Sequence, residues 1–426
     1  SELSGNMIDV CPVGALTSKP FRFSARAWEM QQRDSIAPHD AVGSNIHLHI
    51  RNNQVMRVVP KENEAINEVW ISDRDRFSYQ GLTAEDRLTT PMIKKDDTWQ
   101  TTDWETALAY ATKGLKGVIN AHGSASVGAL ASPTDTVEEL YLLQKLMRGI
   151  GSQNIDHRLR QVDFSDQNEA PLFPYLGQTI ADLEQCDAAF VIGSHIHKEQ
   201  PLLNHRLRKA SLRGAKVMLL NPVDYEFNFA IAEKMIATPA TWVENLAAIT
   251  KALLEKSATL IPASMEALLA NVSINDSQRA IAKSLKTGKK RTVLLGQLAI
   301  AHSQFSVIRA LAALIAKLSG ANLGYLGEAN NTVGAWLAGV LPHREPAGKS
   351  VNTAGLNAYT MLTQGMNAYV LLGLEPELDS WNGATALATL KKAEFVVSLS
   401  AYQTPAIESY ADVILPHSTY LERFEP

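Results

Sequence analysis

"AAFVIGSHIHKEQPLLNHRLRKASLRGAKVMLLNP" is the sequence of residues 188–222, and it decides the fold class. Its two ends, 188–194 and 215–222, are apolar runs typical of buried strands. The segment between them, from about Glu199 to Leu212, has helical spacing and stops before Gly214. This order predicts a β-α-β unit. Apolar runs that alternate with helices are typical of parallel strands covered on both faces, so we expect doubly wound α/β layers.

The same alternation continues on both sides of this unit. Upstream, a strand at 125–132 precedes a T-x-x-E capping box, Thr136 to Glu139, which predicts a helix that stops near Gly149. Downstream, we predict a helix over Ser303–Leu318 that ends at Gly320. Further strands are predicted at 291–297, 367–376, 394–400 and 412–416.

The first 90 residues follow a different pattern. Residues 44–60 alternate polar and apolar side chains around a central "RNNQ", which predicts a β-hairpin. A turn-rich stretch then gives way to a helix that should start around Thr102 and Asp103. We therefore expect a small β-rich module ahead of the α/β layers.

Composition and charge exclude several classes of protein. The 426 residues are 46% hydrophobic and 20% charged, with a net charge of -4 and a pI near 6.3, which disfavours nucleic acid and anionic membrane surfaces as partners. The most apolar stretch, Val307–Leu318, is interrupted by Arg309 and Lys317, so we expect no direct membrane span. Two cysteines exclude a disulfide scaffold and favour a reducing compartment. Both ends look cut, and we expect a piece of a longer polypeptide.

The loop "SIAPHDAVGSN", residues 35–45, has the spacing of a cluster site without its thiols. With cysteine at four positions the sequence would read C-x2-C-x3-C-x27-C, a [4Fe-4S] ligand pattern. These predicted lost cluster positions are Ala37, Asp40, Ser44 and Ser72.

Several segments resemble the molybdopterin oxidoreductase superfamily. "APHDAVGSN" followed by "NEVWISDRDRF" resembles its amino-terminal cluster module, including the pair Asp73 and Arg74. "RLTTPMI" with "WETALAYA", and the β-α-β unit quoted first, resemble its next segments. "GNMIDVCPVGALTSKPFRFSARAWE" (5–29) is similar to the linking segment of the large iron-sulfur subunit of NADH:quinone oxidoreductase, or respiratory complex I. The resemblance implies that Cys11, in a Cys-Pro pair, ligates a [4Fe-4S] cluster whose other cysteines lie upstream of residue 1.

This resemblance implies three regions. They are the end of a ferredoxin-like iron-sulfur segment (1–25), a β-rich module that resembles a [4Fe-4S] domain without its cysteines (26–90), and a molybdopterin-oxidoreductase-like α/β region truncated at its C-terminus (91–426). It further implies that the chain has a mainly structural role in a larger complex. That complex would move electrons from NADH through iron-sulfur clusters to quinone and couple this to proton translocation. No catalytic residue and no bound molybdopterin are expected. The partners would be other peripheral-arm subunits, at the cytoplasmic face of a bacterial inner membrane.

Two other functions stay open at this point. One is a molybdopterin-dependent oxidoreductase such as a formate dehydrogenase, and the other is a non-catalytic assembly platform. The segment 154–167, where a metal ligand would be sought, offers only oxygen donors, namely Asp156, Asp163, Ser165 and Asp166. The single glycine of "VIGSHI" is no dinucleotide fingerprint, so NADH should bind elsewhere in the complex.

The remaining polar residues have ordinary structural interpretations. Two histidine pairs, His47 with His49 and His195 with His197, share strand-like spacing but lack further zinc ligands. His39 with Asp40 is a weak candidate for iron, and Cys186 is expected in the core. One set of neighbouring charged residues is expected to form ion pairs on a solvent-exposed surface. These are Asp34, Asp40, Asp73 and Asp75 with Arg33, Arg74 and Arg76.

Overall fold

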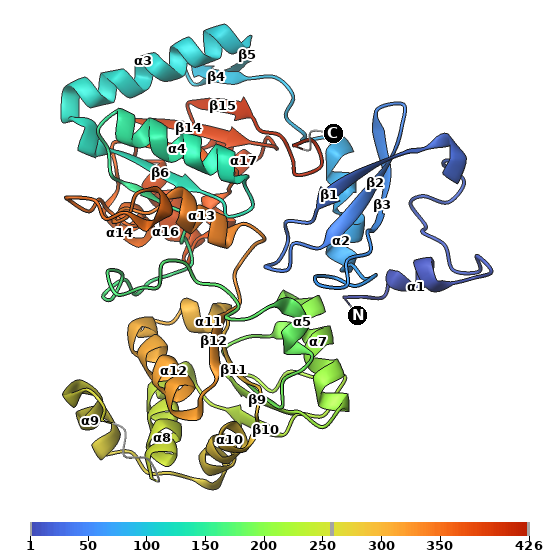
Figure 1. Ribbon diagram of the computed structural model, residues 1–426. Helices are drawn as coiled ribbons and strands as arrows, with labels where there is room; N and C mark the ends of the chain where they lie inside the picture. Colours follow the sequence, from blue (N-terminus) through green and yellow to red (C-terminus); the bar gives the residue numbers. More distant parts are fainter. Residues whose placement is uncertain (1, 256–259, 424–426) are drawn as a thin grey trace.

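The computed structural model describes residues 2–255 and 260–423, and within these ranges the chain forms three β-sheets (Figure 1). Residues 1 and 424–426, at the ends of the first and last predicted regions, lie outside the described residues, as do 256–259. The small β-rich module and the α/β layers that the sequence predicted are both present. Among the described helices, none is both long and apolar enough to cross a membrane.

The first sheet is antiparallel and has the order β1-β2-β3. The predicted hairpin is confirmed as β2 (Asn45–Arg51) and β3 (Gln54–Pro60), joined at Asn52 and Asn53, whose positive φ angles of 52° and 59° suit a two-residue hairpin turn. The sequence did not predict β1 (Gln31–Ile36), because five of its six residues are polar. The helices of this part are α1 (Asn6–Val10), η1 (Ala27–Glu29), α2 (Asp73–Phe77) and η2 (Ser78–Thr83).

The second sheet has seven strands in the order β5-β4-β15-β14-β13-β6-β7. A hairpin of β4 and β5 lies antiparallel at one edge, and the other strands are parallel. The strands are β4 (Met92–Lys95), β5 (Thr98–Thr101), β6 (Val127–Ala131), β7 (Ile155–Asp156), β13 (Ala368–Leu372), β14 (Phe395–Ser400) and β15 (Val413–Pro416).

Helices bury both faces of this sheet. Side chains of α3 (Trp104–His122), α4 (Val137–Gly149) and α13 (Thr332–Ala338) pack on one face, and those of α14 (Ala358–Gln364), α16 (Gly383–Leu390) and α17 (Pro405–Glu408) pack on the other. The predicted helix starts are confirmed, since Asp103 caps α3 and the Thr136–Glu139 capping box opens α4. Shorter helices are η3 (Ser124–Ser126), η5 (Pro346–Gly348) and α15 (Pro376–Asp379).

The third sheet is fully parallel, with the order β10-β9-β8-β11-β12. Its strands are β8 (Ala188–Ile192), β9 (Lys216–Asn221), β10 (Glu233–Ile236), β11 (Arg291–Leu295) and β12 (Asn322–Tyr325). Its helices are α5 (Ile180–Leu183), α6 (Ile196–Glu199), α7 (Pro201–Leu212), η4 (Pro239–Thr241), α8 (Trp242–Leu254), α9 (Ala263–Ala270), α10 (Asp276–Thr287), α11 (Gln297–Ile300) and α12 (Phe305–Ser319). The predicted β-α-β unit is β8-α7-β9, and Cys186 is buried beside it, as expected.

The third sheet is inserted into the second. The chain leaves the seven-stranded sheet after β7, builds all five strands of the parallel sheet, and returns at α13, which precedes α14 and β13. Periodicity predicted the individual strands but not their division into two sheets, because it carries no information on which strands pair.

A short segment after β15, residues 417–423, joins the seven-stranded sheet to the β-rich module, and we call it the strap. Its Leu421 lies in the hydrophobic core of the module with Ile46 and Ile71. The hydroxyl groups of Tyr420 and Ser78 hydrogen-bond across 2.6 Å. Figure 1 shows the red segment that follows β15 between the sheet that contains β15 and the module.

Candidate functional site

Cys11 lies at the end of helix α1, in a turn whose backbone amides face its sulfur. The N–H of Leu16 donates to Sγ over 3.5 Å. Hydrogen bonds from this amide, and from those of Val13, Ala15 and Gly14, hold the pKa of the Cys11 thiol below its usual range. Because the thiolate is the form that binds metal, the turn suits a metal-ligating cysteine. Its role as a cluster ligand stays a prediction.

The four predicted lost cluster positions are all buried, with 1%, 2%, 0% and 1% of Ala37, Asp40, Ser44 and Ser72 exposed. The N–H of Ala37 donates to the carbonyl of Ser44 over 2.9 Å and closes the loop between them. Ser72 is the N-cap of α2, and its hydroxyl accepts the N–H of Asp75. Since these side chains offer no thiolate and Ala37 offers no donor atom, they do not fit an iron-sulfur cluster.

Charged side chains tie this loop to helix α2. Nδ1 of His39 lies 2.8 Å from Oδ1 of Asp75, and Nη2 of Arg74 lies 3.7 Å from Oδ2 of Asp40. Oδ1 of Asp40 accepts the N–H of Val42, while its Oδ2 has no hydrogen-bond partner among the described residues. Burial, together with the nearby charge of Asp75, raises the pKa of Asp40 to about 7. The hydrogen bond from Val42 and the charge of Arg74 lower this pKa, but by less.

The prediction of a solvated ion-pair face is wrong for part of the set. Asp40, Asp75 and Arg76 are buried, with 2%, 1% and 4% exposed. Arg76 forms an ion pair with Asp9 of the N-terminal helix α1, and Asp75 lies beside His39 of the loop. Asp34 is exposed, as expected. Adjacent opposite charges therefore serve here to join two segments in the interior rather than to solvate a surface.

The segment 154–167 forms internal ion pairs and hydrogen bonds. Its four candidate oxygen ligands all have protein partners: Asp156 with Arg158, Asp163 with Ser165 and Ser306, and Asp166 with Arg309. The first pair is a buried fork, with Nε and Nη2 of Arg158 at 2.8 and 2.9 Å from the two oxygens of Asp156. These oxygens do not belong to the ligand cluster that the described part of the chain forms.

A cavity lies at the carboxyl ends of the strands of both α/β sheets, where such folds bind ligands. Its three arginines are each neutralised by a carboxylate: Arg158 by Asp156, Arg160 by Glu328 and Arg309 by Asp166. A molybdopterin phosphate needs donors that are free to bind it, and molybdenum needs a ligand from the protein. The described lining residues supply neither an unpaired cation nor a thiol, so they do not fit that group.

The two histidine pairs have other partners. Nδ1 of His47 lies 2.8 Å from Asp34, and Nδ1 of His49 accepts from Arg57. The ring of His195 stacks on Tyr225 with centroids 4.0 Å apart. Among the described residues, no further histidine, cysteine or carboxylate completes a three-ligand cluster around either pair.

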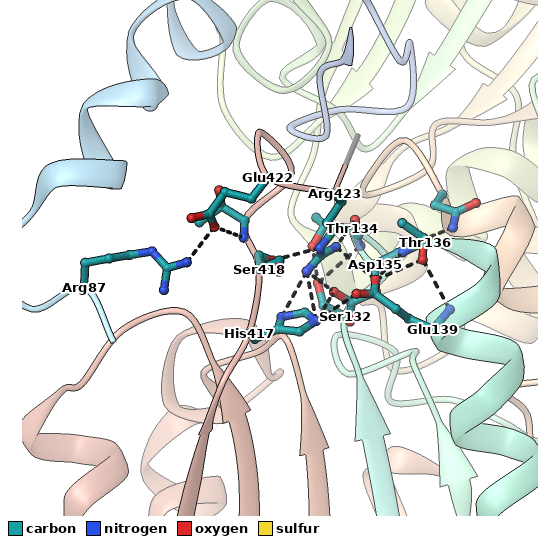
Figure 2. A network of polar contacts seen from close by, with 12 residues as sticks. Arg87, Ser132, Thr134, Asp135, Thr136, Glu139, His417, Ser418, Glu422 and Arg423 are labelled. Atoms are coloured by element: carbon teal, nitrogen blue, oxygen red, sulfur yellow. Dashed lines mark hydrogen bonds and ion pairs between the residues drawn. The ribbon is translucent and has the colours of Figure 1, made fainter. Parts of the chain in front are cut away.

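Sequence reasoning missed one cluster of ligand-type side chains, made by Asp135, Glu139 and His417 (Figure 2). The sequence pattern indicated Glu139 only as a capping residue. A signal was present, because Asp135 closely follows β6 and His417 directly follows β15. The carboxyl ends of parallel strands in one sheet lie at the same edge, which brings residues that follow them together.

Two family models match the chain. The model described as molybdopterin oxidoreductase matches residues 87–425, and the model described as NADH-ubiquinone oxidoreductase NDSU1/NuoG-like, 4Fe-4S domain, matches residues 30–80. The second match covers the loop whose cysteines are absent.

Named relatives agree with these matches. The chain is 30% identical over 423 residues to the mitochondrial NADH-ubiquinone oxidoreductase 78 kDa subunit of Candida albicans, covering 99% of this chain and 51% of that protein. It is 40% identical over 232 residues to the NADH-ubiquinone oxidoreductase 75 kDa subunit of Reclinomonas americana, covering 50% and 32%. It is 40% identical over 221 residues to an NADH-quinone oxidoreductase subunit of Rickettsia felis, covering 51% and 32%. The matches therefore span about half or less of these relatives.

A solved structure shows the same fold. Acetylene hydratase from Pelobacter acetylenicus superposes with a TM-score of 0.66 at 15% sequence identity, covering 92% of this chain and 64% of that one. At this identity the likeness concerns the fold alone. It confirms the predicted arrangement of a small module followed by α/β layers.

Proposed function

This chain belongs to the molybdopterin oxidoreductase family, and we propose that it is part of the large, NuoG-like iron-sulfur subunit of an NADH:quinone oxidoreductase. The proposed complex moves electrons from NADH through iron-sulfur clusters to quinone and couples this to proton translocation. The names of the relatives and the subunit-type model over residues 30–80 support the proposal.

The turn at Cys11 is the observation that carries this function. Its amides stabilise a thiolate at the sequence position where the resemblance implies a [4Fe-4S] ligand. When bound, such a cluster accepts and releases one electron at a time. The chain contains one other cysteine, Cys186, which is buried in the parallel-sheet domain, so the remaining thiolates would come from outside these 426 residues. The Leu16 amide would then hydrogen-bond to the ligating sulfur and tune the potential of the cluster.

The rest of the chain has a mainly structural role in this proposal. The loop from Ala37 to Ser44 keeps its fold through buried ion pairs and the cap of α2. The N–H of Ala41 in this loop donates to Oε1 of Gln200 over 3.1 Å and so joins the module to the α/β region, and in this proposal the loop contributes no metal ligands.

The surface around Cys11 supports contacts with other parts of the same complex. Apolar side chains are strongly exposed there, with 54% of Met7, 82% of Val13, 95% of Phe23 and 82% of Trp28 accessible. Several large apolar side chains in one short segment are typical of an interface. The proposed partners are the iron-sulfur segment and other peripheral-arm subunits, at the cytoplasmic face of a bacterial inner membrane.

A molybdopterin-dependent reaction, such as that of a formate dehydrogenase, is the less favoured alternative. The cavity at the carboxyl ends of the strands has all three of its arginines paired. A purely non-catalytic platform is the other alternative, and it differs in giving Cys11 no role in a cluster.

Metal analysis and low-temperature EPR of the full-length protein test the proposal. We expect Cys11→Ser to abolish one [4Fe-4S] signal and to lower the iron content by about four atoms per chain, with no molybdenum in either sample. Cys186→Ser is the matched control and should keep every cluster signal, because this thiol is buried away from the turn. Molybdenum in the wild type, or unchanged signals in Cys11→Ser, would contradict the proposal.

A further inference from the structure

A cluster of metal-ligand side chains lies at the edge of the seven-stranded sheet, apart from the site proposed at Cys11. Asp135, Glu139 and His417 place ligand atoms within 4.8 Å of one another. Nε2 of His417 is 3.3 Å from Oε1 of Glu139 and 3.7 Å from Oδ1 of Asp135. Asp135 and Glu139 flank the N-cap of α4, while His417 is the first residue of the strap (Figure 2).

One buried carboxylate oxygen in this cluster is unsatisfied. Asp135 is 0% exposed, and its Oδ2 has no hydrogen-bond partner among the described residues. Figure 2 shows its carboxylate turned toward His417 and Glu139. A Cβ atom at Gly373 would lie 2.5 and 2.6 Å from the two oxygens, so a glycine gives this carboxylate its space. Buried polar atoms normally have a hydrogen-bond partner, and buried charges are normally paired or bound to a metal.

Arg423 of the strap neutralises the cluster only in part. Its Nη2 donates to Oδ1 of Asp135 over 2.9 Å, and its Nη1 lies 3.3 Å from Oε2 of Glu139. The same Nη2 is 2.9 Å from Nδ1 and 3.0 Å from Nε2 of His417. Nearly equal distances to both ring nitrogens place this Nη2 beside the face of the imidazole ring. A ligand could therefore bind a nitrogen of His417 only after the guanidinium of Arg423 moves.

The two oxygens of Glu139 have separate roles. Oε2 accepts the N–H and the hydroxyl of Thr136, which completes the capping box of α4. Oε1 faces His417. A cation bound at Oε1 would therefore leave the helix cap intact.

We propose that Asp135, Glu139 and His417 form a zinc site that is guarded by Arg423. Imidazole nitrogens and carboxylate oxygens are both zinc ligands, and three protein ligands with one position left open are a known zinc arrangement. Mg²⁺ and Ca²⁺ fit less well, because they prefer oxygen ligands throughout. Zn²⁺ would balance both carboxylates and satisfy Oδ2 of Asp135, while Arg423 moves aside. The metal would join the strap to the start of α4 and so fix the module against the sheet.

Zinc binding to the full-length protein, measured by competition with a chromophoric chelator, tests the site. We expect the wild type to bind one zinc ion per chain more than Glu139→Gln, a variant that keeps the capping box but loses a charged ligand. Arg423→Gln should bind this ion at least tenfold more tightly, because it removes the competing cation. His47→Ala, which changes a surface histidine beside Asp34, is the matched control and should match the wild type.

The variant that removes Arg423 makes the test decisive. If Arg423→Gln binds no more zinc than Arg423→Gln combined with His417→Ala, the site does not exist. X-ray absorption at the zinc edge should show nitrogen and oxygen neighbours at about 2.0–2.1 Å in Arg423→Gln. Sulfur neighbours would assign the ion elsewhere and overturn the proposal. Zinc should also slow hydrogen exchange in residues 417–423 of the wild type but not of Glu139→Gln.

Discussion

Replacement of Asp40 by asparagine tests the electrostatics of the loop between Ala37 and Ser44. Asp40 is 2% exposed, and its pKa in the folded protein is about 7 rather than 3.8. Above pH 7, folding therefore buries a charge at a free-energy cost of about 4 kcal/mol for roughly three pKa units. Asparagine keeps the acceptor for the Val42 N–H, and the pKa of about 7 already includes the attraction of Asp40 to Arg74. We expect Asp40→Asn to stabilise the protein by about 4 kcal/mol at pH 8.

The pH dependence of this gain has a defined sign. The unfolded chain loses the Asp40 proton near pH 4 and the folded chain near pH 7, so wild-type stability falls as the pH rises through this window. The variant lacks this loss, and its advantage at pH 5 should be less than half of that at pH 8. Urea denaturation at both values measures it, with the exposed Asp34→Asn as control. Destabilisation at pH 8, or equal gains at both values, would refute the reasoning.

Two further predictions concern packing and buried charge. Leu421→Ala should lower the free energy of unfolding by about 2–4 kcal/mol, because Leu421 is 7% exposed in the module core; Leu378→Ala, at a side chain 68% exposed, should change it by about 0.5 kcal/mol or less in the same denaturation assay. Arg158→Leu should cost about 3–5 kcal/mol by leaving Asp156 buried and unpaired. Adding Asp156→Asn should recover most of that loss, and additive losses in the double-mutant cycle would contradict the ion-pair assignment.

Local signals predicted the elements of this fold well. The capping box of α4 and the apolar run of β9 each depend on a few neighbouring residues, and both appear where expected. The strand β1 was not predicted because its side chains are polar and it is held by pairing with β2. The insertion of one sheet into another was also missed, because the hydrophobic periodicity of the sequence does not show which distant strands pair.

The candidate sites show the same difference between local signals and contacts that are distant in sequence. Spacing alone singled out the loop positions from Ala37 to Ser72, and the structure places all of them in the interior. Adjacent opposite charges suggested a solvated surface, but Asp75 is buried, with Nδ1 of His39 2.8 Å from its carboxylate. The contact of Asp135 with His417 joins residues nearly 300 positions apart, so only the shared edge of the sheet could have indicated it.

The strap also sets the order in which this protein can fold. The hydrogen bond between Ser78 and Tyr420 spans 342 positions, and Leu421 completes a core that otherwise belongs to residues before 83. During synthesis, the module must wait until nearly all of these residues have left the ribosome before its core can close. Contacts this distant in sequence slow folding, because the chain between them must first be ordered. The seven-stranded sheet has the same constraint, since Val413 of β15 pairs with Ile93 of β4 across 320 positions. The parallel sheet, whose strands lie between residues 188 and 325, can therefore form first, and the module closes together with the edge of the seven-stranded sheet.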